Sequence, residues 1–145
     1  MKIITVRAPW PWWIMYGGKD IENRSRRWSY QGPLLISQSA AWKEFEVTRD
    51  HVAAMSIWGR SGNRPTLPKD HASMMREWCG HIVGLVDMMG CTEDSPSPWF
   101  VGRFGYGLTR PRPLTTPIPW KGAQSVQDAP DHIRAEVARQ LGDRT

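Results

Sequence analysis

A short polar segment, residues 17–24, constrains this chain more than any other part of its sequence. It reads Gly-Gly-Lys-Asp-Ile-Glu-Asn-Arg, and the two glycines at its start allow the backbone to fold tightly. If residues 21–24 are extended, Glu22 and Arg24 point to the same face, because side chains along a strand alternate with a period of two. Lys19, on the bend before the strand, is able to turn back toward them. The segment predicts a compact site in which one acid lies between two bases.

The flanking segments decide between a buried site and a solvated turn, which is the ordinary structure for such a charge pattern. Residues 9–16 are apolar and rich in tryptophan, and residues 32–36 have the composition of a buried strand. Both neighbours favour the buried site.

Length and composition indicate one domain spanning residues 1–145. The chain is 40% apolar and 23% charged, as in soluble globular proteins. It contains no run of about 18 apolar residues that would cross a membrane. The apolar part of residues 1–7 is too short for a signal peptide, so a cytoplasmic protein without a membrane partner is expected.

Cysteine and histidine are sparse and show no metal-ligand spacing. Two cysteines, Cys79 and Cys91, are too few for a zinc site of their own. His51 and His132 fall in helical stretches and His71 opens one, where a surface position is the default. We therefore expect no metal and no other cofactor.

The charge balance points to an anionic partner. The net charge is +5, with 14 arginines against five lysines. Arginine offers a planar fork that suits phosphate and also stacks on aromatic rings. This makes nucleic acid a candidate partner, although many basic proteins bind none.

Hydrophobic periodicity and Gly/Pro punctuation predict an α+β fold, with five to six strands curled into a small mixed β-barrel and helices around it. Strands are expected over 2–7, 20–25, 33–38, 82–86 and 104–108, the last ending at 110–114. Helices are expected up to Tyr16, from a Ser39 cap onward, over about 69–79 and over about 130–141, with an exposed loop at 59–68. The second helix carries Trp42, Phe45, Val52 and Met55 at helical spacing.

Two positions in the strand over 82–86 stand out. Gly84 lies within an unbroken apolar run and suggests a bulge or a close backbone approach. Asp87 ends the run, so its carboxylate is either paired or faces a cleft at the strand end.

Several segments, in order between residues 6 and 115, resemble the ASCH (activating signal cointegrator homology) domain, a branch of the PUA-like superfamily. Gly17, Lys19, Glu22 and Arg24 match its GxKxxExR signature. The other segments are 6–10 (Val-Arg-Ala-Pro-Trp), 30–36 (Tyr-Gln-Gly-Pro-Leu-Leu-Ile), 82–87 (Ile-Val-Gly-Leu-Val-Asp) and 97–106, which includes Trp99 and Tyr106.

The resemblance implies a small barrel with a cleft beside the signature, in a family whose members bind RNA or DNA. Some relatives accommodate a modified base, and others resemble ribonucleases or amidohydrolases that act on acetylated cytidine. This chain departs from the pattern at Ser37, where many relatives have histidine, and at Glu22, where the amidohydrolases usually have threonine. Both departures argue against amidase activity.

Two main hypotheses follow, and a third, a protein–protein adaptor that uses the loop 59–68, is weaker. The first is a nucleic-acid-binding module for single-stranded RNA or a modified nucleotide. Its predicted binding residues fall into four groups. The phosphate contacts are Arg7, Arg24, Arg26 and Arg27, and the aromatic stacking faces are Trp10, Trp28, Trp99 and Tyr106. Lys19 and Glu22 read base edges, and Ser37 and Asp87 are two further cleft positions. Among the tryptophans, Trp28 is expected to be the most exposed.

The alternative is a hydrolase, a ribonuclease or nucleoside amidohydrolase, with Lys19 and Glu22 as catalytic residues. Lys19 would then need a lowered pKa, which requires burial or a nearby cation such as Arg24. Glu22 acts in the opposite direction and favours the protonated amine.

Overall fold

The computed structural model describes residues 1–62 and 64–145, and it contains strands and helices in mixed order. The strands are β1 (Lys2–Val6), β2 (Ile21–Arg24), β3 (Gly32–Gln38), β4 (His81–Thr92), β5 (Phe104–Pro119) and β6 (Gln127–Asp128). The helices are α1 (Trp10–Tyr16), α2 (Glu44–Arg60), α3 (His71–Glu77) and α4 (Asp131–Leu141), followed by a 3-10 turn over Gly142–Arg144.

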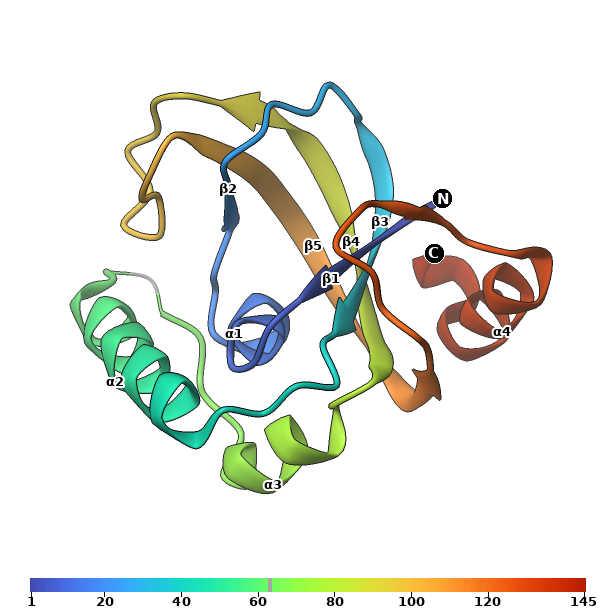
Figure 1. The fold of residues 1–145 in the computed structure, drawn as a ribbon, viewed down its shortest axis with the longest axis horizontal. Coiled ribbons are helices and arrows are strands. Elements are labelled where there is room, and N and C mark those ends of the chain that lie inside the picture. Colours follow the sequence, from blue (N-terminus) through green and yellow to red (C-terminus); the bar gives the residue numbers. More distant parts are fainter. Residues whose placement is uncertain (63) are drawn as a thin grey trace.

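The strands form one sheet in the order β2-β5-β4-β3-β1-β6, in which β1 runs parallel to β3 and the other pairs are antiparallel. The sheet curls into a half-barrel, and α1 lies within the curve (Figure 1). The predicted α+β class with a small, curled, mixed sheet is therefore confirmed, and the sheet has six strands in the part of the chain that the structure describes.

Both faces of the sheet are covered, which explains why its central strands have continuous apolar runs. Ile4, Leu34 and Ile36 belong to a cluster on the inner side with α1. Ile3 and Leu35, one residue out of phase, belong to a second cluster with α4. Strand alternation thus sends neighbouring side chains into two separate cores.

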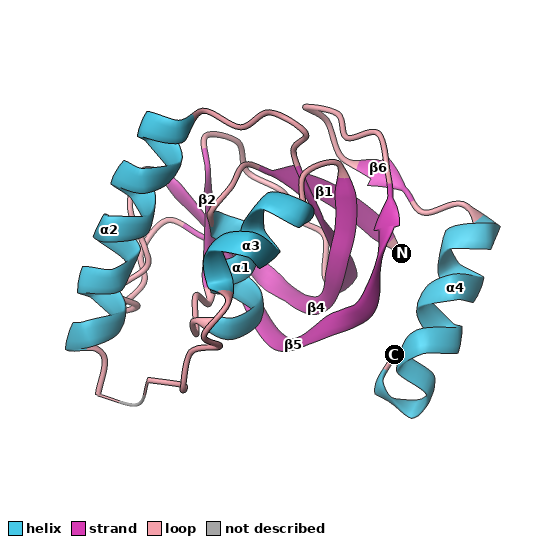
Figure 2. Ribbon diagram, turned by 90° about the horizontal axis from the view of Figure 1, so that it is seen from below, coloured by secondary structure: helices cyan, strands magenta, loops and turns pink. Residues whose placement is uncertain are grey.

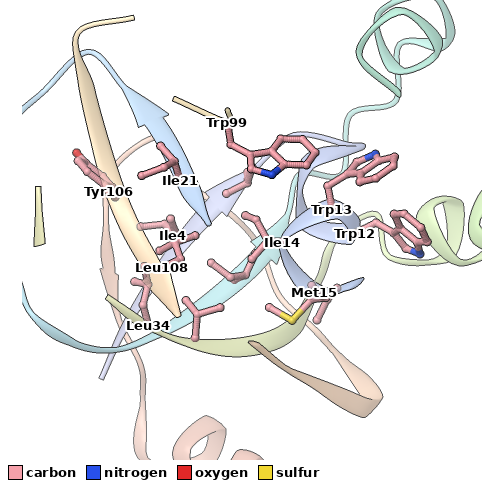
Figure 3. Close-up of a cluster of buried hydrophobic side chains, with 14 of the residues drawn as sticks. Ile4, Trp12, Trp13, Ile14, Met15, Ile21, Leu34, Trp99, Tyr106 and Leu108 are labelled. Atoms are coloured by element: carbon pink, nitrogen blue, oxygen red, sulfur yellow. The ribbon is translucent and has the colours of Figure 1, made fainter. Parts of the chain in front are cut away.

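Helix α1 fills the inside of the half-barrel with large side chains. Trp12 and Trp13 are fully buried, and Ile14 and Met15 are nearly so. Figure 3 shows these side chains among those of the surrounding strands. Gly84 provides the room for this packing, because a Cβ there would run into Met15 and the Arg112 carbonyl, and the β4–β5 register shifts beside it. The bulge and close approach predicted at Gly84 are confirmed.

Helices α2 and α4 lie at opposite ends of the molecule. α2 is on one side and α4 on the other, with the sheet between them (Figure 2). α4 buries Ile133, Val137 and Leu141, and its bounds agree with the predicted helix over 130–141. Within residues 1–62 and 64–145, no helix combines the length and the apolar character that crossing a bilayer requires.

The prediction for α2 was wrong in its start and in its buried face. Lys43, not Ser39, occupies the N-cap position. Phe45 and Val52 are 79% and 63% exposed. The buried residues of the helix lie on a different face and are Val47, Asp50 and Ala54. Helical periodicity allows either of two faces of this helix to be buried. The packing partners, rather than side-chain size, decide that the face with the smaller side chains is buried.

Strand lengths also differed from the predictions. β4 continues past Asp87 to Thr92, and β5 continues past 110–114 to Pro119. β2 pairs only with the start of β5, Phe104–Gly107, so the later part of β5 tolerates prolines as an edge does. The short strand β6 was missed, α3 is shorter than predicted, and Gly59 and Arg60 of the expected loop belong to α2. Asn63 of that loop lies outside the described residues.

The first signature glycine is required by packing. A Cβ on Gly17 would overlap Cε3 of Trp13 and lie 2.8 Å from its Cζ3, and this ring is fully buried. We predict that Gly17→Ala lowers the free energy of unfolding by about 1–3 kcal/mol, as overpacking does. Denaturant unfolding followed by tryptophan fluorescence measures the change.

The matched control is Gly59→Ala, because nothing lies within 4 Å of a Cβ at this position of α2. Removing a helical glycine there raises stability by about 0.5 kcal/mol. Equal stabilities of the Gly17→Ala protein and the wild type would contradict the packing role.

Candidate functional site

The half-barrel is open between β2 and β1, and a signature side chain bridges this seam. β2 ends the sheet on one side, and on the other β6 pairs only with Lys2 and Ile3 of β1. Arg24 Nη2 donates to the Thr5 carbonyl oxygen at 3.0 Å, and Arg24 Nε donates to Glu22 Oε2 at 2.9 Å. Side chains therefore connect the two strands where no backbone ladder does.

A groove of about 670 Å³, here called the signature groove, lies along this seam. Strands β1 and β2, helix α2 and the loop before β5 form its walls. Its lining residues are Thr5, Val6, Arg7, Trp10, Lys19, Glu22, Asn23, Arg24, Ser25, Ala53, Ile57, Trp99 and Val101.

Lys19 and Glu22 are buried in this groove, with exposed fractions of 5% and 6%. Gly18, at φ +78°, turns the chain after α1, and the Lys19 backbone N–H donates to the Trp13 carbonyl at 3.1 Å. The Lys19 amine donates to the Ile21 carbonyl and lies 5.3 Å from the centre of the Trp10 ring. The predicted cluster of Lys19, Glu22 and Arg24 is a buried site and not a solvated turn.

Burial lowers the pKa of Lys19 from its ordinary value. Glu22 and Asp20 act in the opposite direction, and the Arg24 cation adds to the lowering. Desolvation disfavours the charged amine more strongly than the carboxylates favour it. The expectation that Glu22 keeps this lysine protonated describes only the weaker of the two effects.

Arg7 ties the end of β1 to α2. Its guanidinium lies 2.9 Å from Asp50 Oδ2 and 3.7 Å from Glu46 Oε2. This ion pair holds α2 where Ala53 and Ile57 form the apolar wall of the groove. Sequence reasoning found Arg7 but missed both wall residues, because nothing in a helical pattern indicates which turn will border a cleft.

Asn23, the residue between Glu22 and Arg24, was also missed. Its amide donates to the Trp99 carbonyl at 2.9 Å and accepts from the Val101 N–H at 2.9 Å. These two bonds hold the loop that places Trp99 in the groove lining. Trp99 itself is 4% exposed and packs on Trp13, so of the two groove tryptophans Trp10 presents more surface.

A second groove of about 490 Å³ continues from the first, since the two share Thr5, Arg24 and Ser25. We call it the arginine groove. Its lining residues are Ile4, Thr5, Arg24, Ser25, Arg26, Arg27, Trp28, Tyr106, Gln124, Ser125 and Val126. The predicted residues Arg26, Arg27, Trp28 and Tyr106 therefore meet here and not in the signature groove.

Trp28 is less accessible than predicted. It is half-buried, and its ring stacks on Tyr30 with centroids 4.9 Å apart and an interplanar angle of 16°. Tyr106 is 6% exposed, and its hydroxyl donates to the Arg26 carbonyl at 2.8 Å. Tyr30, only two positions further along the chain, covers one face of the tryptophan, a contact that the polar neighbours Arg27 and Ser29 did not indicate.

Ser37 and Asp87 line neither groove. Ser37 is fully buried on β3, and its hydroxyl has no hydrogen-bond partner among the described residues. Asp87 lies 2.7 Å from Arg112 Nη2 and 3.1 Å from Arg110 Nη1. Of the two expectations for this carboxylate, the paired one is confirmed.

The surface positions expected for His51 and His71 were wrong. Both rings are half-buried, with centroids 5.1 Å apart, and Trp13 Nε1 donates to His51 Nδ1 at 3.1 Å. Burial, together with the neighbouring His71, lowers the pKa of His51. His132 is exposed, as expected. Across residues 1–62 and 64–145, no group of three or more His, Cys, Asp or Glu side chains is arranged to hold a metal ion.

Scanned against models of protein families, the sequence matches none, and a search of curated proteins finds no match.

Because Arg24 bridges the seam, removing its side chain should lower the stability of the protein. Arg24→Ala leaves the buried Glu22 carboxylate and the Thr5 carbonyl without this donor. We expect the free energy of unfolding to fall by about 2 kcal/mol, the usual contribution of a hydrogen bond to a charged group. Denaturant unfolding checks this value.

Arg26→Ala is the matched control, because Arg26 is exposed and has no ion pair among the described residues. Its effect on stability should stay within about 0.5 kcal/mol, as for surface substitutions in general. Equal losses in the two variants would mean that Arg24 does not brace the seam.

Proposed function

We propose that this chain is a nucleic-acid-binding module whose signature groove receives a nucleotide of single-stranded RNA, or a modified nucleotide. The observation that carries the proposal is the composition of the groove. A buried amine and a buried carboxylate lie beside Trp10, and the Arg7 and Arg24 cations line the same space. At about 670 Å³, the groove falls within the usual size range of small-molecule sites.

Each lining group has a part in this function. Trp10 offers an aromatic face to an unpaired base, an interaction that contributes about 1–3 kcal/mol. Lys19 donates and Glu22 accepts hydrogen bonds at the base edge. Each has hydrogen-bonding capacity beyond its bond within the protein, Lys19 to the Ile21 carbonyl and Glu22 to Arg24, so a base that leaves this buried capacity unused would be disfavoured. Arg7 and Arg24 supply positive charge for the phosphate backbone.

The resemblance to ASCH and PUA-like domains supports the same proposal. Three of the five segments that carry it meet in one place: residues from 6–10, from the 17–24 signature and from the loop containing Trp99 line the signature groove. A curled mixed sheet with a cleft beside the signature is the arrangement that this resemblance implies. We therefore propose that the chain belongs to this group.

A hydrolase that uses Lys19 and Glu22 is the second candidate, and the lowered pKa of Lys19 favours it. A less protonated amine is a better base or nucleophile. Two observations weigh against it. The Glu22 carboxylate is engaged by Arg24, and Ser37, which replaces a histidine of many relatives, is buried away from both grooves.

The test is a fluorescence-anisotropy titration with labelled single-stranded RNA of about eight nucleotides, with the recovered RNA run on a denaturing gel. We predict binding that weakens roughly tenfold or more between about 50 and about 200 mM salt, and RNA that stays intact. Lys19→Met, which removes the amine and keeps most of the side-chain volume, should weaken binding by about tenfold or more.

Lys69→Met is the control, because it makes the same change at an exposed position outside the groove lining. Thermal unfolding of both variants separates loss of binding from loss of fold. Shortened RNA with wild type but not with Lys19→Met would favour the hydrolase. Absence of both binding and cleavage would contradict the RNA-binding module and a ribonuclease, and would leave a free modified nucleoside as the ligand or substrate to test.

A further inference from the structure

The arginine groove differs from the signature groove in the balance of its charges. Its lining contains Arg24, Arg26 and Arg27 and no aspartate or glutamate. The signature groove carries Arg7, Lys19 and Arg24, but Glu22 lies among them. The signature groove therefore offers cationic donors and an anionic acceptor, whereas the arginine groove offers only cationic donors and neutral groups.

The three arginines of the arginine groove are not equally engaged. Arg24 bonds to Glu22 and Thr5, and Arg27 pairs with Glu93 at 3.1 Å and lies over the Phe104 ring. Arg26 has no ion pair among the described residues. Its backbone is nevertheless fixed, because its carbonyl accepts the hydroxyl hydrogen of the buried Tyr106 at 2.8 Å. One uncompensated guanidinium therefore projects from an anchored backbone.

The opposite wall of the groove, residues 124–126, is held against the seam. The backbone N–H of Ala123 donates to Thr5 Oγ1 at 3.4 Å, and Gly122 packs so closely on Thr5 that a Cβ would not fit. These contacts position Gln124 and Ser125, which add neutral hydrogen-bonding groups to the lining.

The aromatic residues of this groove do not form an open stacking platform. Tyr30 covers one face of Trp28, and the Tyr106 ring lies 5.6 Å from it at an angle of 56°. The groove thus combines uncompensated positive charge with neutral hydrogen-bonding groups, and its aromatic rings are largely covered. This combination suits a phosphate and its sugar better than a second stacked base.

From this geometry we propose that the arginine groove is a phosphate subsite, contacted chiefly by Arg26, for the residue next to the nucleotide held in the signature groove. The ligand is then a polynucleotide strand rather than a free nucleoside, since the two grooves meet at Thr5, Arg24 and Ser25. This inference rests on the proposed function and specifies its substrate class.

The experiment measures the salt dependence of binding to the same labelled RNA for wild type, Arg26→Ala and Arg26→Lys. A lost phosphate contact in a single-stranded complex reduces the slope of log K against log salt by about 0.7. We expect Arg26→Ala to show this reduction and an affinity about tenfold lower at low salt, whereas Arg26→Lys keeps the slope. Unlabelled nucleoside should compete at least roughly tenfold more weakly than a dinucleotide with a 5′-phosphate.

Arg134→Ala is the control for overall charge. It removes one positive charge, as Arg26→Ala does, but from α4 on the far side of the sheet (Figure 2). Its slope should equal that of the wild type. Thermal unfolding confirms that each variant is folded.

The outcomes separate this inference from the proposed function. Salt-sensitive RNA binding with an unchanged slope in Arg26→Ala would overturn the phosphate subsite and leave the binding module standing. Nucleoside that competes as well as the dinucleotide would overturn the subsite in the same way. Absence of RNA binding by the wild type would overturn both.

Discussion

The hydrogen bonds of the Arg24 guanidinium determine where the half-barrel stays open and how its two edges are connected. A curled sheet of this size has two edges to bring together, and backbone pairing between them would fill the seam. Here Arg24 spans it by bonding to the Thr5 carbonyl of β1 and to Glu22 of its own strand. The edges are thus linked through a side chain, and space remains on either side of it. The signature groove and the arginine groove are these two spaces.

The second constraint is the packing of α1 within the half-barrel. Trp13 lies over Gly17 so closely that no side chain fits there, and the Gly18 turn then brings Lys19 into the groove. The same packing removes Lys19 from water and lowers its pKa. The electrostatic character of the site therefore follows from core packing. The amine can donate to a base edge, and its lowered pKa also favours the hydrolase candidate.

Local sequence was sufficient to predict the elements whose hydrophobic periodicity and glycine or proline positions agree with the packing around them. The strands around the signature, the end of α1 at Gly17 and the C-terminal helix followed from it, as did the proximity of Lys19, Glu22 and Arg24. It failed where a distant partner decides. The buried face of α2 depends on such a partner, and so does the identity of the two arginines, Arg110 and Arg112, that pair with Asp87. The walls contributed by Ala53, Ile57 and the 124–126 segment were missed for the same reason.

The proposed function requires a single-stranded nucleic acid to occupy the seam between β1 and β2. The nine tryptophans provide a direct test, since each indole N–H gives its own NMR signal and Trp→Phe variants assign them. On titration with single-stranded RNA, we expect the signals of Trp10 in the signature groove and Trp28 in the arginine groove to shift. The signal of Trp120, which packs near α4, should not shift. Shifts at Trp120 with none at Trp10 or Trp28 would place the ligand elsewhere and contradict the proposed function.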